Sequence, residues 1–436
     1  MFPDAHKEEN QLSKENLRLK SAVEELSILN DIATAVASTQ SLNQITNLIV
    51  KKCVKHLKAE QGSIQLVDEK DFANPFHTMI RVRDKQDNKT LRFNKIMADL
   101  MIAQRKPMRI NEFKAGEKIE LSDKSDLRIK SLLSVPMIIK GKMIGILSLF
   151  NKESNEGFTE ADQRLLSIIA SQSAHVIENS RLFEEEKQLL QIQQEIQVAR
   201  DIQKNLLPKE IPRIKDYDIY AINIPAREVG GDYYDFIKIT ESKTAIALGD
   251  VSGKGLPAAM LMANLQATLR SQLLFCNCAK DCIKRANNLL HKSTDITKFV
   301  TLFFAILDTA KNSLTYCNAG HNTPLLLQND KKLELNKGGI LLSCMENINY
   351  DEEEIQFEQG SVLVVFSDGI TEAMNEDEQE FGEKKLEAIL FENLNESSQG
   401  ITEKILNAVS KHKGNALQSD DITIMIIKRN GVKKRE

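Results

Sequence analysis

The chain has 436 residues, of which 42% are hydrophobic and 28% charged, with a formal net charge of −4 at pH 7. This is the balance of a soluble globular protein with two or three domains, and it carries no basic excess that would indicate a nucleic-acid partner. No apolar run reaches the ~18 residues of a membrane span, no signal peptide is evident, and the six cysteines fit reduced thiols, so we expect a cytoplasmic protein without a membrane partner.

Residues 1–24 are predicted to form an N-terminal helix. Over residues 9–30, Leu12, Leu19 and Leu26 recur every seven positions among Glu and Lys. Such a short heptad seam is typical of a dimerising helix, and equally of an amphipathic helix that lies on its own domain. Both interpretations stay open from the sequence.

Residues 25–180 alternate between helical and extended patterns. A helix is predicted over 42–57, a strand over 62–68, and a pair of strands over 132–139 and 143–152. Gly141 supplies the permissive position of the turn between those two strands. A long helix then begins after Thr159, whose side chain is suited to cap it.

That helix continues far beyond a domain boundary, through a predicted coiled-coil linker at 181–209. Leu182, Leu189, Ile196 and Gln203 repeat every seven residues, and Pro208 ends the run. We expect a homodimer through helices 9–30 and 181–207; the alternative is a helix packed on its own domain. Gln203 would weaken the seam locally, which suits a junction that must move.

Residues 210–430 are rich in predicted strands, with helices between them, and favour a layered α+β sandwich. The strands are expected at 217–226, 232–239, 244–252, 301–309, 313–321, 361–369 and 420–428. The helices are expected at 255–275, 280–293, 383–393 and 401–412.

Three cysteines, Cys276, Cys278 and Cys282, lie close together around the start of the second of these helices. Their spacing, C-x-C-x₃-C, is not a usual zinc spacing, and the flanking residues have a helical pattern. We therefore favour thiols that pack a helix over a metal site.

The stretch "ALGDVSGKGLPAAML", residues 247–261, suggests either a phosphate-binding loop or a carboxylate presented to a metal. A Walker A loop needs four residues between its glycines and a hydroxyl residue after the lysine. Here three residues separate Gly249 from Gly253, and Gly255 follows Lys254. The phosphate-loop interpretation fails at both places.

The carboxylate interpretation is supported by acids at the ends of four apolar strands: Asp232, Asp250, Asp368, and the pair Asp420 and Asp421. A single Asp at such a place is usually a turn former. Four of them with no Lys or Arg beside each are costly to bury unless a cation offsets their charge. All-oxygen ligation favours Mg²⁺ or Mn²⁺, with glycines that let the backbone turn around the ion.

Five segments, "REVGGDYYDF", "GDVSGKGLPAAMLM", "NAGHNTPLLL", "FSDGITEA" and "SDDITIMII", together resemble the PP2C-like serine/threonine phosphatases of the bacterial SpoIIE and RsbU type across 210–430. The resemblance implies an αββα sandwich with two Mn²⁺ or Mg²⁺ ions. Asp232 and Asp250 would flank both ions, and the carbonyl of Val251 would be a further ligand. Asp368 and Asp420 would complete the set of ligands around the second ion.

Three other residues have weaker assignments by the same resemblance. Asp421 ranks below Asp420 as a ligand. Arg227, five residues before Asp232, matches the offset of a phosphate-binding arginine, and a surface arginine is the equal alternative. His321 is a candidate general acid, but we favour a structural role in its loop.

Residues 25–180 resemble a GAF sensor domain. Asn151, Lys152, Phe158 and Asp162 nearly match the NKFDE motif of cyclic-nucleotide-binding members, but Gln163 stands in place of the final acid. A structural Lys152–Asp162 ion pair explains the match equally well, so no ligand is predicted.

Two functions from different classes follow. The first is a metal-dependent protein serine/threonine phosphatase, gated by its GAF domain, that dephosphorylates a STAS-type anti-sigma factor antagonist through a metal-activated water. The second is a phosphatase-like module that has lost turnover and regulates by binding. The complete acidic set favours the enzyme.

Overall fold

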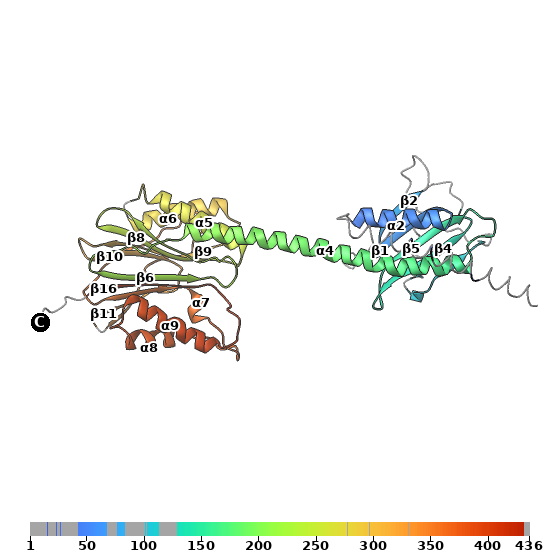
Figure 1. The fold of residues 1–436 in the computed structure, drawn as a ribbon. Coiled ribbons are helices and arrows are strands. Elements are labelled where there is room, and N and C mark those ends of the chain that lie inside the picture. Colours follow the sequence, from blue (N-terminus) through green and yellow to red (C-terminus); the bar gives the residue numbers. More distant parts are fainter. Residues whose placement is uncertain are drawn as a thin grey trace, which may run out of the picture. The chain divides into compact units, whose positions relative to one another are not determined.

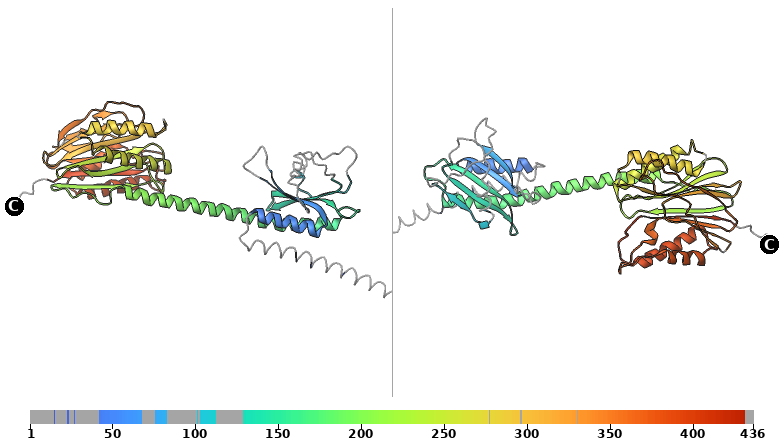
Figure 2. Two further views of the ribbon diagram at one scale, coloured as in Figure 1. Left: turned by 90° about the horizontal axis from the view of Figure 1, so that it is seen from above. Right: turned by 180° about the vertical axis from the view of Figure 1, so that it is seen from behind.

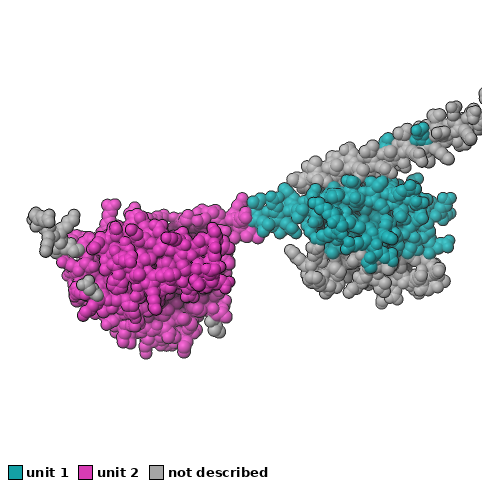
Figure 3. Space-filling view, turned by 90° about the horizontal axis from the view of Figure 1, so that it is seen from below, with its two compact units in different colours: residues 1–190 teal, residues 191–436 magenta. Residues whose placement is uncertain are grey.

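The structure is a computed structural model that describes residues 42–67, 76–82, 103–112, 129–276, 278–295, 297–329 and 331–430, with isolated positions 15, 23, 27 and 101. The chain divides into two compact units, residues 1–190 and 191–436 (Figure 3). The predicted helix 1–24 and the heptad seam at 9–30 lie almost wholly outside the described residues.

The first unit is built on one antiparallel sheet in the order β2-β1-β5-β4-β3. Its elements in chain order are α2 (Leu42–His56), β1 (Ala59–Val67), β2 (Phe76–Val82), β3 (Met108–Ile110), β4 (Leu132–Ile139), β5 (Lys142–Lys152) and α4 (Glu160–Leu206). Helix α2 and the first part of α4 cover one face of the sheet (Figure 1). The buried side chains between these layers include Ile49, Ile64, Leu147 and Ile169.

The near-match to the NKFDE motif forms a brace between β5 and α4. Lys152 Nζ lies 2.8 Å from Asp162 Oδ1, and both side chains are largely buried. The same carboxylate accepts from the backbone N–H of Thr159 at 2.7 Å, while the Thr159 hydroxyl accepts from the N–H of Asp162 at 3.2 Å. These reciprocal bonds cap α4. The Lys152–Asp162 pair is therefore structural, and Thr159 caps the helix as predicted.

Helix α4 runs for 47 residues and ends at Leu206, two residues before Pro208, as the sequence predicts. Several large apolar side chains on its middle part are more than half exposed to solvent. They are Leu182, Phe183, Leu189, Leu190, Ile192, Val198 and Ile202, and we call this set the α4 stripe. Among the described residues no helix, α4 included, combines the length and apolarity that a membrane crossing requires.

The second unit contains two sheets. The first has the order β13-β10-β9-β8-β7, with β14 paired to β10, and the second has the order β12-β11-β15-β16-β6. The strands are β6 (Tyr217–Ile224), β7 (Tyr233–Lys238), β8 (Lys243–Val251), β9 (Val300–Asp308), β10 (Ser313–Ala319), β11 (Leu325–Gln328), β12 (Lys331–Glu334), β13 (Gly338–Gly339), β14 (Glu353–Gln356), β15 (Val362–Phe366) and β16 (Ile422–Arg429). The helices are α5 (Leu256–Gln272), α6 (Ala279–Ser293), α7 (Asp368–Thr371), α8 (Glu383–Glu392) and α9 (Ser398–Lys413).

These elements stack in four layers, with α5 and α6 outside the first sheet and α8 and α9 outside the second (Figures 1 and 2). Buried apolar residues fill all three spaces between the layers. Phe303 of β9 and Met425 of β16 belong to the middle core, which joins the two sheets. The predicted αββα sandwich is confirmed.

The sequence did not predict the short elements of this unit. Strands β11 to β14 have two to four residues each, and every side chain of β12 is exposed, so they show no alternation of apolar and polar positions. Helix α7 has four residues and begins at Asp368, where a strand was expected to continue. Helix α5 ends at Gln272, three residues earlier than predicted.

The three neighbouring cysteines pack around the start of α6. Cys276 and Cys282 are buried in the core beneath α5 and α6, and Cys278 donates to Asp281 Oδ2 at 3.1 Å. Burial raises the pKa of Cys282 to about 12 and that of Cys278 to about 11. The burial of Cys276 and Cys282 among apolar side chains fits a packing role.

Candidate metal centre

The acids predicted from the strand ends come from both sheets. Asp232 stands directly before β7 and Asp250 lies near the end of β8; they are one step beyond the paired residues Tyr233 and Gly249. In the second sheet, Asp368 follows β15 and Asp420 precedes β16, and these two strands are paired. Adjacent strands therefore bring the four acids to one end of the sandwich.

The electrostatics of the cluster show that these carboxylates influence one another. Asp232 is 2% exposed, and burial followed by the charge of Asp250 raises its pKa well above the usual value. Burial and then the charges of Asp368 and Asp420 raise the pKa of Asp250 to about 7. Burial, Glu372 and Asp420 raise the pKa of Asp368 to about 6. The cluster holds more negative charge than its surroundings offset.

This donor set fits a divalent cation. The groups are carboxylates, they are desolvated, and each disfavours ionisation of another, so a cation among them would relieve all of these costs together. Among the described residues, no three Asp, Glu, His or Cys side chains are already gathered around one point as a bound metal ion requires. The carboxylates therefore do not form a closed ligand set in the described structure.

One basic residue does reach the cluster, which corrects the sequence expectation. Lys254 Nζ lies 3.1 Å from Asp420 Oδ2 and also donates to the carbonyl of Ser419. Its charge also lowers the pKa of Asp368, against the larger raising effects. Lys254 and Asp420 are far apart in the chain, so only the fold brings them together.

Asp421 makes different contacts from its chain neighbour Asp420. It is buried and accepts from the backbone N–H groups of Ala226 at 2.7 Å and Gly231 at 2.6 Å. A carboxylate fully occupied by backbone donors fixes the path of a loop. Asp421 in the second sheet thereby holds the loop that presents Asp232 in the first.

Thr423 was not singled out from the sequence. Its hydroxyl donates to Asp232 Oδ2 and accepts from Asn223 Nδ2 at 2.7 Å, and its backbone N–H donates to Ser367 Oγ at 2.9 Å. The signal in the sequence was a single hydroxyl residue within the apolar run "ITIMII". In the structure its side chain is fully buried. Thr423 orients Asp232 from the opposite sheet.

The glycines around Asp250 differ in what they do. Gly253 has φ of +97° and makes a left-handed turn that a side chain rarely adopts. Gly249 lies inside β8, where a Cβ atom would stand 2.7 Å from the Thr301 carbonyl. Gly249 therefore allows close packing of strands, whereas Gly253 and Gly255, with φ of +97° and +73°, lie where the backbone turns after Asp250. The Val251 carbonyl faces Gly231, at 2.7 Å from the place of an added Cβ.

Arg227 and His321 occupy contrasting environments. Arg227 is exposed on the loop held by Asp421, and within the described residues it makes no hydrogen bond or ion pair. His321 is buried, shares a 2.9 Å hydrogen bond with the Thr301 hydroxyl, and has its pKa lowered to about 4 by burial. A neutral imidazole at that pKa is a poor general acid near pH 7.

The end of α4 contacts the loop beside Asp232. Gln203 Nε2 donates to the carbonyl of Gly230 at 2.6 Å, and the N–H of Gly230 donates to Gln203 Oε1 at 3.1 Å. Gln266 of α5 donates to the Leu206 carbonyl at 3.2 Å. The end of α4 therefore contacts both the Gly230 loop and α5.

Comparisons with known proteins identify relatives of both units. Residues 240–430 match the family described as stage II sporulation protein E (SpoIIE), and residues 39–178 match the GAF domain. The chain is 32% identical over 242 residues to phosphoserine phosphatase RsbU of Bacillus subtilis (strain 168), covering 55% of this chain and 71% of RsbU.

Two further relatives are more distant. Protein IcfG of Synechocystis sp. is 28% identical over 264 residues, covering 54% of this chain and 42% of IcfG. The fold is similar to the solved SiaA PP2C domain of Pseudomonas aeruginosa, with a TM-score of 0.50 at 17% identity, covering 56% of this chain and 98% of that one. These findings confirm the resemblances that the motifs predicted.

Proposed function

The chain belongs to the RsbU and SpoIIE family of PP2C-type serine phosphatases, and we propose that its acidic cluster makes it a metal-dependent protein phosphatase. The observation that carries this proposal is the set of desolvated acids from two sheets, whose raised pKa values show uncompensated charge. The sequence-derived bounds, a GAF domain at 25–180, a linker at 181–209 and a phosphatase domain at 210–430, remain part of the proposal.

The residues that would hold Mn²⁺ or Mg²⁺, in one or two positions, are Asp232, Asp250, Asp368 and Asp420 through their carboxylates and Val251 through its carbonyl. The bound cations would supply an acidified water and would stabilise charge on the phosphoryl oxygens. Asp421 and Thr423 fix Asp232 in place, and Lys254 restrains Asp420.

Arg227 is proposed to bind the phosphoryl group of the substrate. It is exposed and unpaired in the described structure, and it stands on a loop whose backbone Asp421 already fixes at Ala226. A guanidinium without an internal partner is free to donate two parallel hydrogen bonds to the oxygens of a phosphate group.

The proposed substrate is a phosphorylated STAS-type anti-sigma factor antagonist, in which a phosphoserine is hydrolysed and the serine oxygen is the leaving group. The name of the relative RsbU, a phosphoserine phosphatase, supports the phosphoserine. The STAS partner rests on the resemblance to the family.

The central experiment measures Mn²⁺-dependent hydrolysis of p-nitrophenyl phosphate by the full chain, with EDTA-treated protein as the reference. We expect turnover that needs added Mn²⁺ or Mg²⁺. Absence of turnover with either ion, in protein that is folded by circular dichroism, would leave the binding-module alternative.

The GAF domain is proposed to gate this activity through α4 in a homodimer. Leu182, Leu189 and Ile192 of the α4 stripe lie on the predicted heptad seam and are more than half exposed, so pairing two copies along this seam would bury them. Gln203 at the end of the same helix contacts Gly230, so a rotation or shift of the pair has a route to the Asp232 loop.

Insertions near Gln193 test the gating. Three or four added residues rotate the heptad seam out of register, whereas seven preserve it. We expect a strong change of basal specific activity from the short insertions and recovery of much of it with seven. Identical activities for all variants, or a monomeric parent in light scattering at micromolar concentration, would reduce α4 to a spacer.

A further inference from the structure

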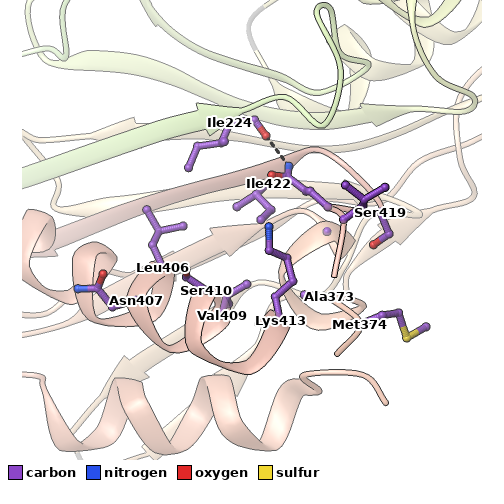
Figure 4. A pocket seen from close by; sticks show the side chains of 13 residues that line it. Ile224, Ala373, Met374, Leu406, Asn407, Val409, Ser410, Lys413, Ser419 and Ile422 are labelled. Carbon is purple, nitrogen blue, oxygen red and sulfur yellow. Dashed lines mark hydrogen bonds between the residues drawn. The ribbon is translucent and has the colours of Figure 1, made fainter. Parts of the chain in front are cut away.

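A pocket of about 290 Å³ opens in the second unit between α9 and the ends of β6 and β16 (Figure 4). Most of its lining is apolar, from Ile224, Ala373, Met374, Leu406, Val409 and Ile422. We call it the α9 pocket. Its volume lies at the lower end of the range for ligand sites, which leaves room for one or two side chains.

The α9 pocket shares its wall with the acidic cluster. Gly369 and Ser419 line it, and they are the direct chain neighbours of Asp368 and Asp420. Lys254 holds this part of the wall in place, because it pairs with Asp420 and donates to the Ser419 carbonyl. A segment that binds in the pocket would thus lie against the backbone next to Asp368 and Asp420.

Lys413 places an uncompensated positive charge in the pocket. It stands in the last turn of α9, is half-buried, and extends into the pocket toward Ile422 (Figure 4). Among the described residues no carboxylate lies within ion-pairing distance of its ammonium. An ammonium directed into a mostly apolar pocket is stabilised when a bound group brings an anion.

Leu417 adds an apolar rim to the same opening. Its side chain is 91% exposed, yet it lines the pocket beside Lys413. A large apolar side chain held in water next to a partly apolar recess gains stability when a second apolar group covers it. The pocket therefore combines an apolar recess, an apolar rim and one cation.

We propose that the α9 pocket docks a segment of the phosphoprotein substrate that carries a large aliphatic side chain followed by a carboxylate, close to the phosphoserine. The aliphatic group enters the recess against Leu406 and Leu417, and the carboxylate pairs with Lys413. This inference rests on the proposed phosphatase function and adds to it a determinant of substrate choice.

The test uses the full chain with Mn²⁺ and two kinds of substrate. The first is p-nitrophenyl phosphate, which is too small to reach the α9 pocket. The second is a series of synthetic phosphoserine peptides in which one Leu–Glu pair is moved stepwise away from the phosphoserine, with a Gly–Gln pair as reference. We expect one position of the Leu–Glu pair to raise kcat/KM by about tenfold over the reference, through KM.

Two variants then probe the pocket, and one serves as control. Lys413→Glu should remove the preference for Leu–Glu, and should transfer it to the matching Leu–Lys peptide. Ser410→Trp, which fills the opening from an exposed position, should remove the preference for both peptides. Lys404→Glu makes the same charge change at an exposed site of α9 outside the pocket and should leave the preference intact.

The outcomes separate this proposal from the function on which it rests. If the parent hydrolyses neither substrate, the phosphatase function fails and the docking proposal fails with it. If p-nitrophenyl phosphate is hydrolysed but all peptides are equivalent, or if Lys413→Glu shows no transfer to Leu–Lys, only the docking proposal is overturned. Loss of p-nitrophenyl phosphate turnover in Lys413→Glu would mark a structural effect and also overturn it.

Discussion

Two buried carboxylates three residues apart, Asp235 and Asp232, have surroundings of opposite charge. Asp235 is completely buried and accepts from Arg270 Nε at 2.8 Å, Arg270 Nη2 at 3.1 Å and the Tyr233 hydroxyl at 2.8 Å. Asp232 is almost as deeply buried, but its charged neighbours are other acids. The chain compensates the first charge internally with Arg270, and the second charge is the one that we propose a metal ion compensates.

The difference shows which buried acids stabilise the fold and which serve a site. Asp235 ties β7 to α5 through a two-pronged ion pair, an arrangement that depends on both partners. Burial and the charge of Asp250 raise the pKa of Asp232, and burial with the charges of Asp368 and Asp420 raises that of Asp250, so ionising these acids is costly.

The largest effect is expected from neutralising the cluster. Asp250→Asn and Asp368→Asn should each lower Mn²⁺-dependent turnover of p-nitrophenyl phosphate by at least about 10³-fold, because each removes a charged ligand. The metal-free variants should melt no lower than the parent, since a repulsive charge has gone. Asp377→Asn, an exposed acid, is the control. Near-normal turnover in either variant would show that these acids hold no metal.

The second prediction breaks the compensated acid. Arg270→Ala should destabilise the second unit by about 3 kcal/mol, since it leaves Asp235 charged and buried without its partner. Urea unfolding of the full chain, followed by the transition of that unit, measures the loss. Adding Asp235→Asn to this variant should recover part of the stability. If the double variant is no more stable than Arg270→Ala alone, the buried charge is not the cause.

The third prediction concerns the link from α4. Gln203→Ala removes both hydrogen bonds to Gly230 and should lower activity by about tenfold, as expected when a positioning contact of ~1.4 kcal/mol is lost. The deficit should shrink at high Mn²⁺ concentration, because the loop then gains order from the ion. Gln194→Ala, at an exposed position on the same helix, is the matched control. A deficit that does not depend on Mn²⁺ would argue against positioning of the Asp232 loop.

The smallest effect is a pH dependence of stability. Burial and neighbouring carboxylates raise the pKa of Asp250 to about 7 and that of Asp368 to about 6, above their values in the unfolded chain. A raised pKa means that the folded state binds protons more tightly, so the metal-free protein loses stability as pH rises from about 4 to 7. The melting temperature should fall by a few degrees over that window, and added Mn²⁺ should recover more of it at pH 8 than at pH 5.5. Equal recovery at both values would contradict this.

Much of the candidate site could be read from the sequence because each acid lies at the end of a long apolar strand. The strands β7, β8, β15 and β16 are recognisable, and their ends bring the acids together once two sheets are expected. The hydrogen bonds that hold the loops of the site in place could not be predicted in this way. Asp421 reaches Ala226 across 195 residues of chain, Lys254 reaches Ser419 across 165, and Gln203 reaches Gly230 across 27.

Such contacts depend on the packing of one sheet on the other and leave no periodic signal in the chain. The adjacent acids Asp420 and Asp421 illustrate the limit. They are chemically identical, and their roles diverge only because one faces Lys254 and the other faces the backbone of the Asp232 loop.

The space around Asp421 has a consequence for how this protein tolerates mutation. A Cβ atom on Gly230 would stand 2.4 Å from the Asp421 carboxylate, and one on Gly369 would stand 2.0 Å from the Asp421 carbonyl. Neither glycine offers a ligand or a charge. In a survey of all single substitutions scored by activity, these two positions should nevertheless be as intolerant as the acids themselves, so that sites of chemistry and sites of close packing would be indistinguishable by that score alone.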